Sequence, residues 1–570
     1  MSSIAKYPYS AEGLSKIREW HYGVNWPVVY IIYNTDTAYV GETLDAVRRT
    51  EQHLQEDEFN RFTDICLISS KTYNKSVILD LESFLIKYMS AEESKKLING
   101  NAGVVDHDYF YREAYEDDFR EIWKKLMELD IVKKSLEEIE NSELFKYSPY
   151  KSLNEEQQKA AYQILKRLSE INNASQQTII EVRGGAGTGK TILAVYLVKL
   201  LVDISRNRKS LEYIDDSENA EAVRRLMKKL SGLNDIGFVV PMKELYSVMK
   251  RIFTSIDGLS ADMVLRPKEV MKHNRYDVLF VDEAHRLYRR CNLSSAKAYS
   301  DFDAINKSLM ADAYRKDVND YTELDWIIRQ SRYQVLFYDE RQRIRSCDID
   351  VERYKRICQP HLFQSIELFS QMRCKGGNGY YEYVKEILES KNLSLKGYRP
   401  ILNYEVQIFD RIEDLFHIIN EKEKSDGLSR VVCGPGWSAK EDIIIEGHVY
   451  TWAQGRDYTY KPDTILSIHK SQGFDLNYTG VIFGKEIYYD DVQGCIMVNK
   501  KELKDPMTKS EGDVVMRQNV LNMYLTLMTR GIKGTFVYAV DNGLKNYLKT
   551  FLSKKEEESL MGIADNHSFT

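Results

Sequence analysis

The chain has 570 residues, enough for about four domains at roughly 150 residues each. Hydrophobic residues make up 43% and charged residues 29%, so the composition excludes a disordered or collagen-like chain. The net charge of −6 excludes a uniformly basic coat for nucleic acid, but it is compatible with a local basic groove.

Cysteine usage and the apolar runs indicate the cellular setting. The seven cysteines are odd in number and never stand two residues apart, so we expect neither a disulfide framework nor a zinc ribbon. The N-terminal MSSIAKYPYS lacks the pattern of a signal peptide, and no run reaches the 18 apolar residues of a membrane span. We therefore expect a reduced, cytoplasmic protein that does not enter a membrane.

Residues 1–105 are expected to form a small α+β domain. Residues 28–43, VVYIIYNTDTAYVGET, contain two β-branched and aromatic runs separated by Asn34, Thr35 and Asp36, which predicts a β-hairpin. A helix-like stretch, LDAVRRTEQHL, follows, and SVILDLESFLIKYM later repeats apolar residues at a helical period.

Residues 106–150 differ in charge from their surroundings. They hold 13 acidic and 7 basic residues in a pattern typical of amphipathic helices with solvated faces, which predicts an acidic helical connector. Residues 1–105 carry 14 acidic and 11 basic residues, and residues 151–570 carry 59 and 62. The negative charge of the chain therefore lies at its front, ahead of a slightly basic remainder.

From residue 151 onward the pattern predicts an α/β fold. Apolar strands alternate with helices, which is typical of doubly wound parallel sheets, and we expect two such lobes over 151–350 and 351–570. The predicted strands are TIIEVRGG, GFVVP, YDVLFVDE, YQVLFYDE, RVVCG, TILSIH, TGVIFG and GTFVYAV. Residues 203–236 and 286–330 are polar and interrupt this rhythm, so we expect them to be insertions.

A phosphate-binding loop follows the first of these strands. The complete pattern G-x-x-x-x-G-K-[ST] lies between the strand TIIEV and the apolar helix ILAVYLVKLL, the context that the motif requires. Its backbone N–H groups would surround the phosphates, the lysine would reach the outer phosphates and the threonine would ligate Mg²⁺. The residues that we expect to bind ATP here are Gly184, Gly185, Ala186, Gly187, Thr188, Gly189, Lys190 and Thr191.

A second acidic motif ends the strand YDVLFVDE. Asp282 and Glu283 stand at the carboxyl end of this strand, where α/β sheets present groups to their ligands. We expect Asp282 to hold Mg²⁺ through its water shell and Glu283 to activate the attacking water.

These motifs and those that follow resemble a superfamily 1 helicase, and in detail the bacterial Schlafen group 3-like helicase domain family. LNEEQ, which ends at Gln157, resembles an adenine-reading motif, and LFYDERQ resembles a coupling motif with Asp339 and Gln342 in matching positions. In FSQMRC, Arg373 matches an arginine that reaches the γ-phosphate. The resemblance covers about residues 151–550 and implies two RecA-like lobes that use ATP to move along a strand.

Two further segments extend this resemblance. SIHKSQGFD, which contains Gly473, resembles a motif that links nucleic acid to nucleotide. Its sequence is most similar to that of the 5′→3′ branch of superfamily 1. MYLTLMTRGIKG resembles the last motif, which implies that Arg530 acts as an arginine finger between the lobes.

A different set of residues lies in the first domain. Tyr30 and Tyr39 stand on the predicted hairpin, and Arg49 and His53 share one helix face at i, i+4. Glu82 lies on a later helix. Over residues 25–103 this set resembles the GIY-YIG nuclease family, with Val28 and Val29 in place of the first glycine and isoleucine.

The GIY-YIG resemblance implies metal-assisted hydrolysis of a phosphodiester. Glu82 would hold Mg²⁺ or Mn²⁺, Tyr30 would act as the general base, and Arg49 would stabilise the charged phosphate. Tyr39 and His53 would position groups or carry protons. Either Asn101 or Asn99 matches the late asparagine of the family.

The leading hypothesis is an ATP-driven helicase or translocase fused to a metal-dependent endonuclease that acts on single-stranded or branched DNA. Such a fusion suggests defence against phage or DNA repair, together with partner proteins of those processes. Two alternatives remain open: the first domain is a non-cleaving module that recognises DNA structure, or the whole protein acts on RNA.

Overall fold

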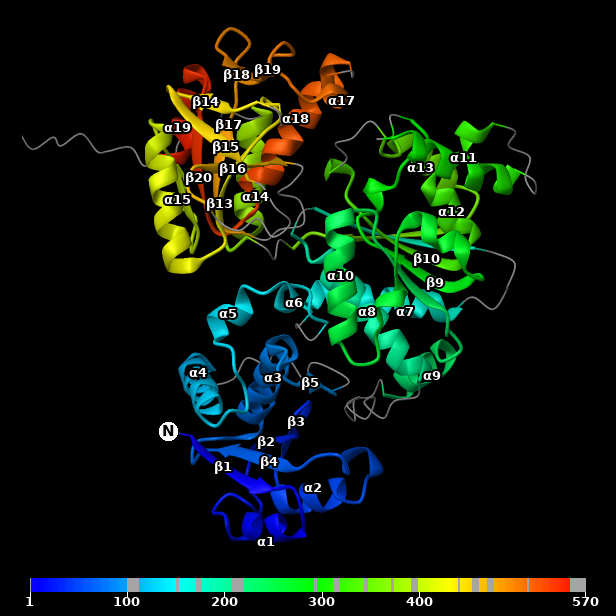
Figure 1. The fold of residues 1–570 in the computed structure, drawn as a ribbon, viewed down its shortest axis with the longest axis vertical. Coiled ribbons are helices and arrows are strands. Elements are labelled where there is room, and N and C mark those ends of the chain that lie inside the picture. Colours follow the sequence, from blue (N-terminus) through cyan, green and yellow to red (C-terminus); the bar gives the residue numbers. More distant parts are fainter. Residues whose placement is uncertain are drawn as a thin grey trace, which may run out of the picture. The chain divides into compact units, whose positions relative to one another are not determined.

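A computed structural model describes most of the chain. It covers residues 2–99, 112–149, 153–170, 177–185, 187–206, 220–291, 293, 295–310, 317–342, 347–370, 374–390, 398–438, 441–453, 461–468, 476–509 and 512–553. The chain divides into two compact units (Figure 1). Unit 1 comprises Met1–Gly184, Gly189–Glu340 and Cys347–Leu368, and unit 2 comprises Gly185–Thr188, Arg341–Ser346 and Phe369–Thr570.

Unit 1 begins with a five-stranded sheet in the order β1-β4-β2-β3-β5. Its strands are β1 (Ser3–Pro8), β2 (Val28–Tyr33), β3 (Thr37–Thr43), β4 (Asp64–Ser69) and β5 (Lys96–Leu97). The predicted hairpin is confirmed, because β2 and β3 pair antiparallel with Tyr30 opposite Gly41. Asn34 closes its turn by accepting hydrogen bonds from the backbone N–H groups of Asp36 and Thr37 at 2.9 and 2.7 Å.

Three helices accompany this sheet, namely α1 (Ala11–Glu19), α2 (Ala46–His53) and α3 (Lys75–Glu92). Asp45 caps the start of α2 and Asn74 caps the start of α3, each through a side-chain oxygen that accepts a backbone N–H. Every second residue of β2, including Val29 and Ile31, packs with the apolar residues of α3. The alternate residues of β2 pack with α1 and α2 instead, so helices cover both faces of the sheet.

The predicted acidic connector forms helices α4 (Arg112–Glu128), α5 (Leu136–Glu140) and α6 (Glu143–Lys146). Trp123 of α4 is buried against the rings of Phe84 and Tyr88 on α3. The connector therefore uses its apolar face to extend the core of the first domain.

The second sheet of unit 1 is parallel throughout, in the order β11-β6-β10-β9-β7-β8. Its strands are β6 (Thr178–Gly184), β7 (Ile236–Val239), β8 (Val264–Leu265), β9 (Tyr276–Val281), β10 (Ser331–Tyr338) and β11 (Leu362–Leu368). Because β11 pairs with β6, this sheet continues past residue 350, where the sequence places the boundary between the lobes.

Alternate residues of these strands enter two separate cores. Val335 and Phe337 of β10 pack with α7 (Glu155–Glu170), α8 (Lys190–Ser205), α9 (Ala220–Leu230) and α10 (Lys243–Ser255), whereas Leu336 and Tyr338 pack with the opposite core. That opposite core contains α11 (Ala296–Met310), α12 (Glu323–Arg329) and α13 (Val351–Cys358). Figure 1 shows the two sets of helices on opposite faces of the sheet.

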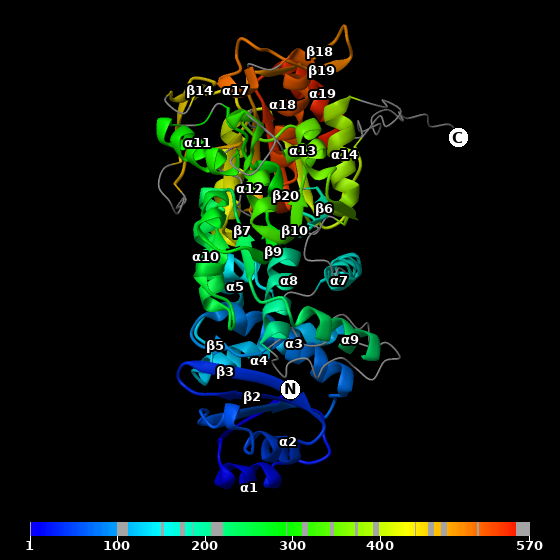
Figure 2. The same cartoon turned by 90° about the vertical axis from the view of Figure 1, so that its right-hand side faces the viewer.

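Unit 2 is built on a seven-stranded sheet in the order β12-β20-β17-β13-β16-β15-β14, and the β14 and β15 pair is antiparallel. Its strands are β12 (Glu405–Ile408), β13 (Ser429–Cys433), β14 (Ile443–Ile445), β15 (His448–Trp452), β16 (Thr464–Ser467), β17 (Leu476–Phe483) and β20 (Gly531–Ala539). A hairpin of β18 (Ile487–Asp490) and β19 (Cys495–Val498) projects from one end of the unit (Figures 1 and 2).

The helices of unit 2 again flank the sheet. One core contains α14 (Gly377–Glu389), α18 (Asp513–Met528) and α19 (Asn542–Leu552), and the other contains α15 (Ile412–Asp426). A short helix, α17 (Pro506–Lys509), precedes α18. The predicted mixed α/β class with parallel sheets is therefore confirmed. Among the residues that the structure covers, no helix has the length and apolar character needed to cross a membrane.

Candidate nucleotide and nuclease sites

The phosphate-binding loop joins β6 to α8 at the carboxyl edge of the parallel sheet. Gly187 and Gly189 adopt φ angles of 82° and 76°, which lie in the left-handed region that favours glycine. Lys190, the first residue of α8, is 5% exposed, and its Nζ donates to the Gly184 carbonyl at 2.6 Å. Thr188 Oγ1 donates to the Gly185 carbonyl at 3.0 Å, which holds the loop in a tight turn.

A hydroxyl and a carboxylate meet beside this loop. Thr191 Oγ1 donates to Asp282 Oδ2 at 2.8 Å, and Asp282 is completely buried at the end of β9. Burial, together with the neighbouring Glu283 carboxylate, raises the pKa of Asp282 to about 7. Asp282 Oδ1 is buried and has no hydrogen-bond partner among the described residues. Hard oxygen groups of this kind fit Mg²⁺, because that cation prefers one or two carboxylates together with phosphate oxygens.

Glu283 and His285 connect the ends of two neighbouring strands. Glu283 adopts a left-handed conformation with φ of 50°, and its Oε2 lies 3.1 Å from His285 Nε2. His285 Nδ1 accepts the backbone N–H of Asp339, which follows β10, at 3.3 Å. Asp339 Oδ2 in turn lies 3.8 Å from Lys190 Nζ. The sequence assigns no role to His285, although the segment Asp282–His285 contains it.

The predicted adenine-reading glutamine lies at the start of α7. The Gln157 backbone N–H donates to Asn154 Oδ1 at 2.8 Å, and the Asn154 N–H donates back to Gln157 Oε1 at 3.2 Å. Gln157 Nε2 also donates to the Gly189 carbonyl at 3.5 Å, so the amide touches the phosphate-binding loop. Gln342 is half-buried at the end of the short helix Glu340–Gln342.

Unit 2 contains the segments of the two predicted phosphate-contacting arginines. Arg530 is 3% exposed and lies between α18 and β20. The Lys375 backbone N–H donates to the Ile532 carbonyl at 2.9 Å, so the segment that follows Arg373 runs beside the one that follows Arg530. Arg373, Ala186 and Gly473 themselves lie outside the described residues.

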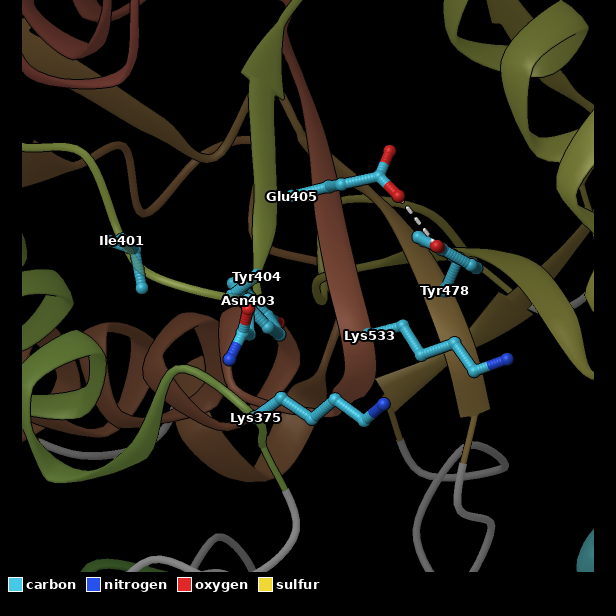
Figure 3. Close-up of a pocket in the computed structure, with 7 residues that line it drawn as sticks. All are labelled: Lys375, Ile401, Asn403, Tyr404, Glu405, Tyr478 and Lys533. Carbon is cyan, nitrogen blue, oxygen red and sulfur yellow. Dashed lines mark hydrogen bonds between the residues drawn. The ribbon is translucent and has the colours of Figure 1, made fainter. Parts of the chain in front are cut away.

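A pocket of about 710 Å³ opens beside these two segments (Figure 3). Figure 3 shows the side chains of Lys375 and Lys533 extending in the same direction, below the hydrogen bond from Tyr478 to Glu405. Lys533 Nζ also pairs with Asp426 Oδ1 at 2.6 Å. The lining residues are Lys375, Ile401, Asn403, Tyr404, Glu405, Tyr478 and Lys533.

The predicted nuclease residues Tyr30, Arg49 and His53 form one hydrogen-bonded group in unit 1. Tyr30 Oη lies 2.9 Å from His53 Nε2, and Arg49 Nε donates to the same oxygen at 3.3 Å. The Tyr39 ring lies beside them, with its centroid 6.2 Å from that of Tyr30 and 5.7 Å from that of His53. The hairpin therefore supplies the tyrosines, and α2 supplies the other two residues.

His53 is a neutral imidazole in this environment. Burial, and to a smaller extent the Arg49 guanidinium, lowers the pKa of His53 to about 3. The ring is 2% exposed, and its centroid lies 4.0 Å from that of Phe59. The Tyr30 hydroxyl and His53 Nε2 share one hydrogen bond in which either group can be the donor, depending on the imidazole tautomer, and His53 Nδ1 lies 3.7 Å from Glu56 Oε2.

Glu82 lies on α3 and is 2% exposed. Burial and the neighbouring Glu42 carboxylate raise the pKa of Glu82 to about 8, and the Lys75 and Arg49 cations partly oppose this shift. Glu82 Oε2 has no hydrogen-bond partner among the described residues. A buried, unsatisfied carboxylate fits a hard cation. Within the described chain, however, no group of three or more His, Cys, Asp and Glu could hold a metal ion.

Two small features fix β3 against this group. A Cβ atom on Gly41 would lie 2.3 Å from Tyr30 Oη, so the tyrosine occupies the space that a side chain at position 41 would need. Asn99 accepts the Val40 N–H at 3.0 Å and donates to the Val40 carbonyl at 2.7 Å. Of the two asparagines left open by the sequence, Asn99 thus contacts the hairpin, and Asn101 lies outside the described residues.

Comparisons with known proteins give both sequence and structure matches. An uncharacterized protein of Saccharomyces cerevisiae is 24% identical over 416 residues, which are 64% of this chain and 83% of the yeast protein. The structure of the Pif1 helicase from Bacteroides with ADP-AlF3 and ssDNA is 11% identical, covers 69% of this chain and 94% of that chain, and gives a TM-score of 0.23.

The structure of the arterivirus nonstructural protein 10 helicase is 12% identical and gives a TM-score of 0.23. That match covers 67% of this chain and 63% of the viral chain, which is less than two thirds of it. TM-scores of this size establish no common arrangement of the whole molecules. The family model for the Schlafen group 3 DNA/RNA helicase domain, in contrast, matches residues 177–541. This range contains both parallel sheets, the phosphate-binding loop and the Asp282–His285 segment. The chain therefore belongs to the Schlafen group 3 DNA/RNA helicase domain family.

Proposed function

We propose that the protein is an ATP-driven motor on DNA whose N-terminal domain cleaves phosphodiester bonds with a divalent cation. The contact between Thr191 and buried Asp282 beside Lys190, within a helicase family domain, supports the motor. The hydrogen-bonded group of Tyr30, Arg49 and His53 supports the nuclease, together with buried Glu82, whose burial-raised pKa the Arg49 guanidinium helps to lower.

In the proposed ATP site, each residue has a separate task. Lys190 releases the Gly184 carbonyl and turns to the outer phosphates. Thr191 and Asp282 would hold the cation, which would neutralise phosphate charge when bound. Glu283 takes the proton of the attacking water, and His285, whose Nε2 lies 3.1 Å from Glu283 Oε2, helps to keep that carboxylate in place. Gln157 fixes the loop from the adenine side, and Gln342 follows the end of β10 as the coupling residue.

In the same proposal, Arg373 and Arg530 stabilise charge on the transferred phosphoryl group. The hydrogen bond between Lys375 and Ile532 supports a shared role, because it ties together the two segments that carry these arginines. Gly473 belongs to the segment that would link the bound nucleic-acid strand to the nucleotide site.

In the proposed nuclease site, Tyr30 and His53 form a proton relay. Tyr30 Oη takes a proton from the attacking water while it passes its own proton to His53 Nε2, which is 2.9 Å away and neutral. Arg49 stabilises the negative charge that develops on the phosphate, and Tyr39 holds the imidazole by packing on it. Glu82 would hold Mg²⁺ or Mn²⁺, which polarises the scissile phosphate when bound.

The nuclease proposal is tested by plasmid nicking in Mg²⁺. We expect the wild type and Glu12→Gln to nick equally, since Glu12 is an exposed residue of α1 paired with Lys16. Glu82→Ala and Tyr30→Phe should lose at least about 100-fold in rate, as removal of a catalytic acid or base usually does. Equal nicking by wild type and Glu82→Ala would remove the nuclease assignment.

The motor proposal is tested by ATP hydrolysis in the presence of DNA. Lys190→Ala should abolish the DNA-stimulated ATPase, because the loop then has no cation for the outer phosphates. ATPase activity that survives this change would remove the phosphate-binding loop from the mechanism.

RNA is a second candidate track, because the family description covers DNA and RNA helicases alike. Labelled single-stranded DNA and RNA of the same sequence should therefore be compared as stimulators of the ATPase. Stimulation by RNA alone would replace DNA in the proposal, and DNA binding without cleavage in several divalent metals would favour a structure-recognition role for the first domain.

A further inference from the structure

Two carboxylates meet where the hairpin packs on α3. Glu42 follows Gly41 on β3 and lies opposite Val29 in the hairpin. Glu82 lies in the middle of α3, which packs against β3, and the Glu42 carboxylate is near enough to raise its pKa. A strand and a helix that are far apart in sequence thus bring two acidic side chains to one place.

Each of these carboxylates has one oxygen that no described group satisfies. Glu82 Oε2 and Glu42 Oε2 are both buried without a hydrogen-bond partner among the described residues. The Glu42 side chain is 9% exposed and Glu82 is 2% exposed, so bulk water does not solvate them freely. Buried carboxylate oxygens need donors or a cation, so two such oxygens together point to a cation between them.

One movable cation already lies at this place. Lys75, the first residue of α3, pairs through Nζ with Glu42 Oε1, and its side chain is 49% exposed. Lys75 and Glu82 are two helical turns apart on one face of α3. The ammonium therefore reaches the outer oxygen of Glu42 from the solvent side and leaves the inner oxygens of both carboxylates unsatisfied.

We propose that Glu42 is a second carboxylate ligand of the divalent cation at Glu82, and that Lys75 releases Glu42 when this cation binds. The inference rests on the proposed nuclease function, which assigns a cation to Glu82 alone. Two carboxylates leave further coordination positions for water and a phosphate oxygen, an arrangement that Mg²⁺ and Mn²⁺ accept. The ammonium of Lys75 is then free to approach the bound phosphodiester.

Binding of Mn²⁺ itself tests this inference without any measurement of cleavage. The full-length chain is used in an Asp282→Asn background, which removes the carboxylate beside the phosphate-binding loop as a competing site. Free Mn²⁺ is followed by electron paramagnetic resonance during a titration without nucleotide. Thermal unfolding of each variant shows whether it is folded, and Glu12→Gln controls for the loss of one surface carboxylate.

We expect Glu42→Gln and Glu82→Gln each to weaken Mn²⁺ binding by about tenfold or more, as loss of a metal-site group usually does. Lys75→Gln should tighten binding, because the competing ammonium is gone. If Glu82→Gln weakens binding but Glu42→Gln behaves like Glu12→Gln, the shared-ligand inference is wrong and the nuclease proposal stands. If neither change weakens binding, the cation assignment at Glu82 fails as well. Unchanged affinity in Lys75→Gln would overturn the release of Glu42.

Discussion

At the scale of single residues, the first domain depends on close contacts around one phenol oxygen. Tyr30 Oη contacts Arg49 and His53 and occupies the space beside Gly41. The resemblance to the GIY-YIG nuclease family named Tyr30, Arg49 and His53 from the sequence, and the i, i+4 spacing placed Arg49 and His53 on one helix face. It did not find the pairing of Glu42 with Lys75, since contacts between a strand and a distant helix leave no local periodic signal.

We predict that Gly41→Ala disables the group without removing any of its members. The new Cβ would lie 2.3 Å from Tyr30 Oη, so the tyrosine must move and the proton relay must lengthen. Cleavage should fall, and the free energy of unfolding should drop by about 1–3 kcal/mol, as for other overpacked sites. Gly232→Ala is the matched control, because a Cβ there meets nothing within 4 Å. Full cleavage by Gly41→Ala would show that Tyr30 is not held as described.

The burial of His53 predicts a pH dependence of stability. Its pKa is lowered to about 3 in the folded chain from an ordinary value near 6.5, so the unfolded chain binds the extra proton more readily. The stabilising contribution is complete above about pH 6.5 and decreases as the pH falls, by up to about 1.4 kcal/mol per pH unit. Thermal unfolding of wild type and His53→Gln between pH 8 and pH 5 should show this loss in the wild type alone. Parallel curves would contradict the neutral, buried imidazole.

At the scale of elements, the sequence predicted strands far better than their arrangement. Runs such as YDVLFVDE are apolar throughout because both faces of a parallel strand are buried, and this signal is local. The membership of β11 was missed, because LFQSIEL at the edge of its sheet is neither apolar throughout nor strictly alternating. The role of His285 was missed for a related reason, since it acts by joining β9 to the residue after β10.

A buried carboxylate also links elements of unit 2. Glu486 is fully buried and accepts a hydrogen bond from the Tyr524 hydroxyl of α18. Its carboxylate occupies the space that Cβ atoms on Gly434, Gly436 and Gly484 would need. Burial raises the pKa of Glu486 to about 7, with the Tyr524 hydrogen bond opposing the shift. The end of β13, the start of the β18 and β19 hairpin and α18 therefore meet around one acid.

We predict that the effect of Glu486→Gln on the free energy of unfolding depends on pH. A folded pKa above the unfolded value means that the wild type holds its full contribution below about pH 4.5 and loses it as the pH rises through 7. The neutral glutamine has no such loss, so the variant should gain stability relative to wild type between pH 5 and pH 8. The unfolding midpoint in urea at these two pH values measures this difference. A constant difference would show that Glu486 keeps one protonation state throughout.

At the scale of the whole molecule, the chain combines a domain that the family match identifies as a helicase family domain with a first domain whose chemistry is a proposal. The family match begins at residue 177, so it does not cover the Tyr30 group or Glu82. The motor motifs follow one another in sequence order and could be recognised as a series. A relation between ATP use and cleavage could not be recognised in this way, because no local sequence pattern records it.

We predict that the two activities are separable by single changes in the same protein. Glu82→Ala leaves the phosphate-binding loop intact, and Lys190→Ala leaves the Tyr30 group intact. Each variant should therefore lose one activity and keep the chemistry of the other.

The most direct test measures ATP hydrolysis and DNA cleavage together, in one Mg²⁺ reaction on a branched DNA substrate. Glu82→Ala should hydrolyse ATP at the wild-type rate without cleaving the DNA. Lys190→Ala should hydrolyse no ATP and cleave only as much as the wild type does without nucleotide. Cleavage by Glu82→Ala at the wild-type rate, or none by the wild type under any of these conditions, would contradict a nuclease joined to this motor.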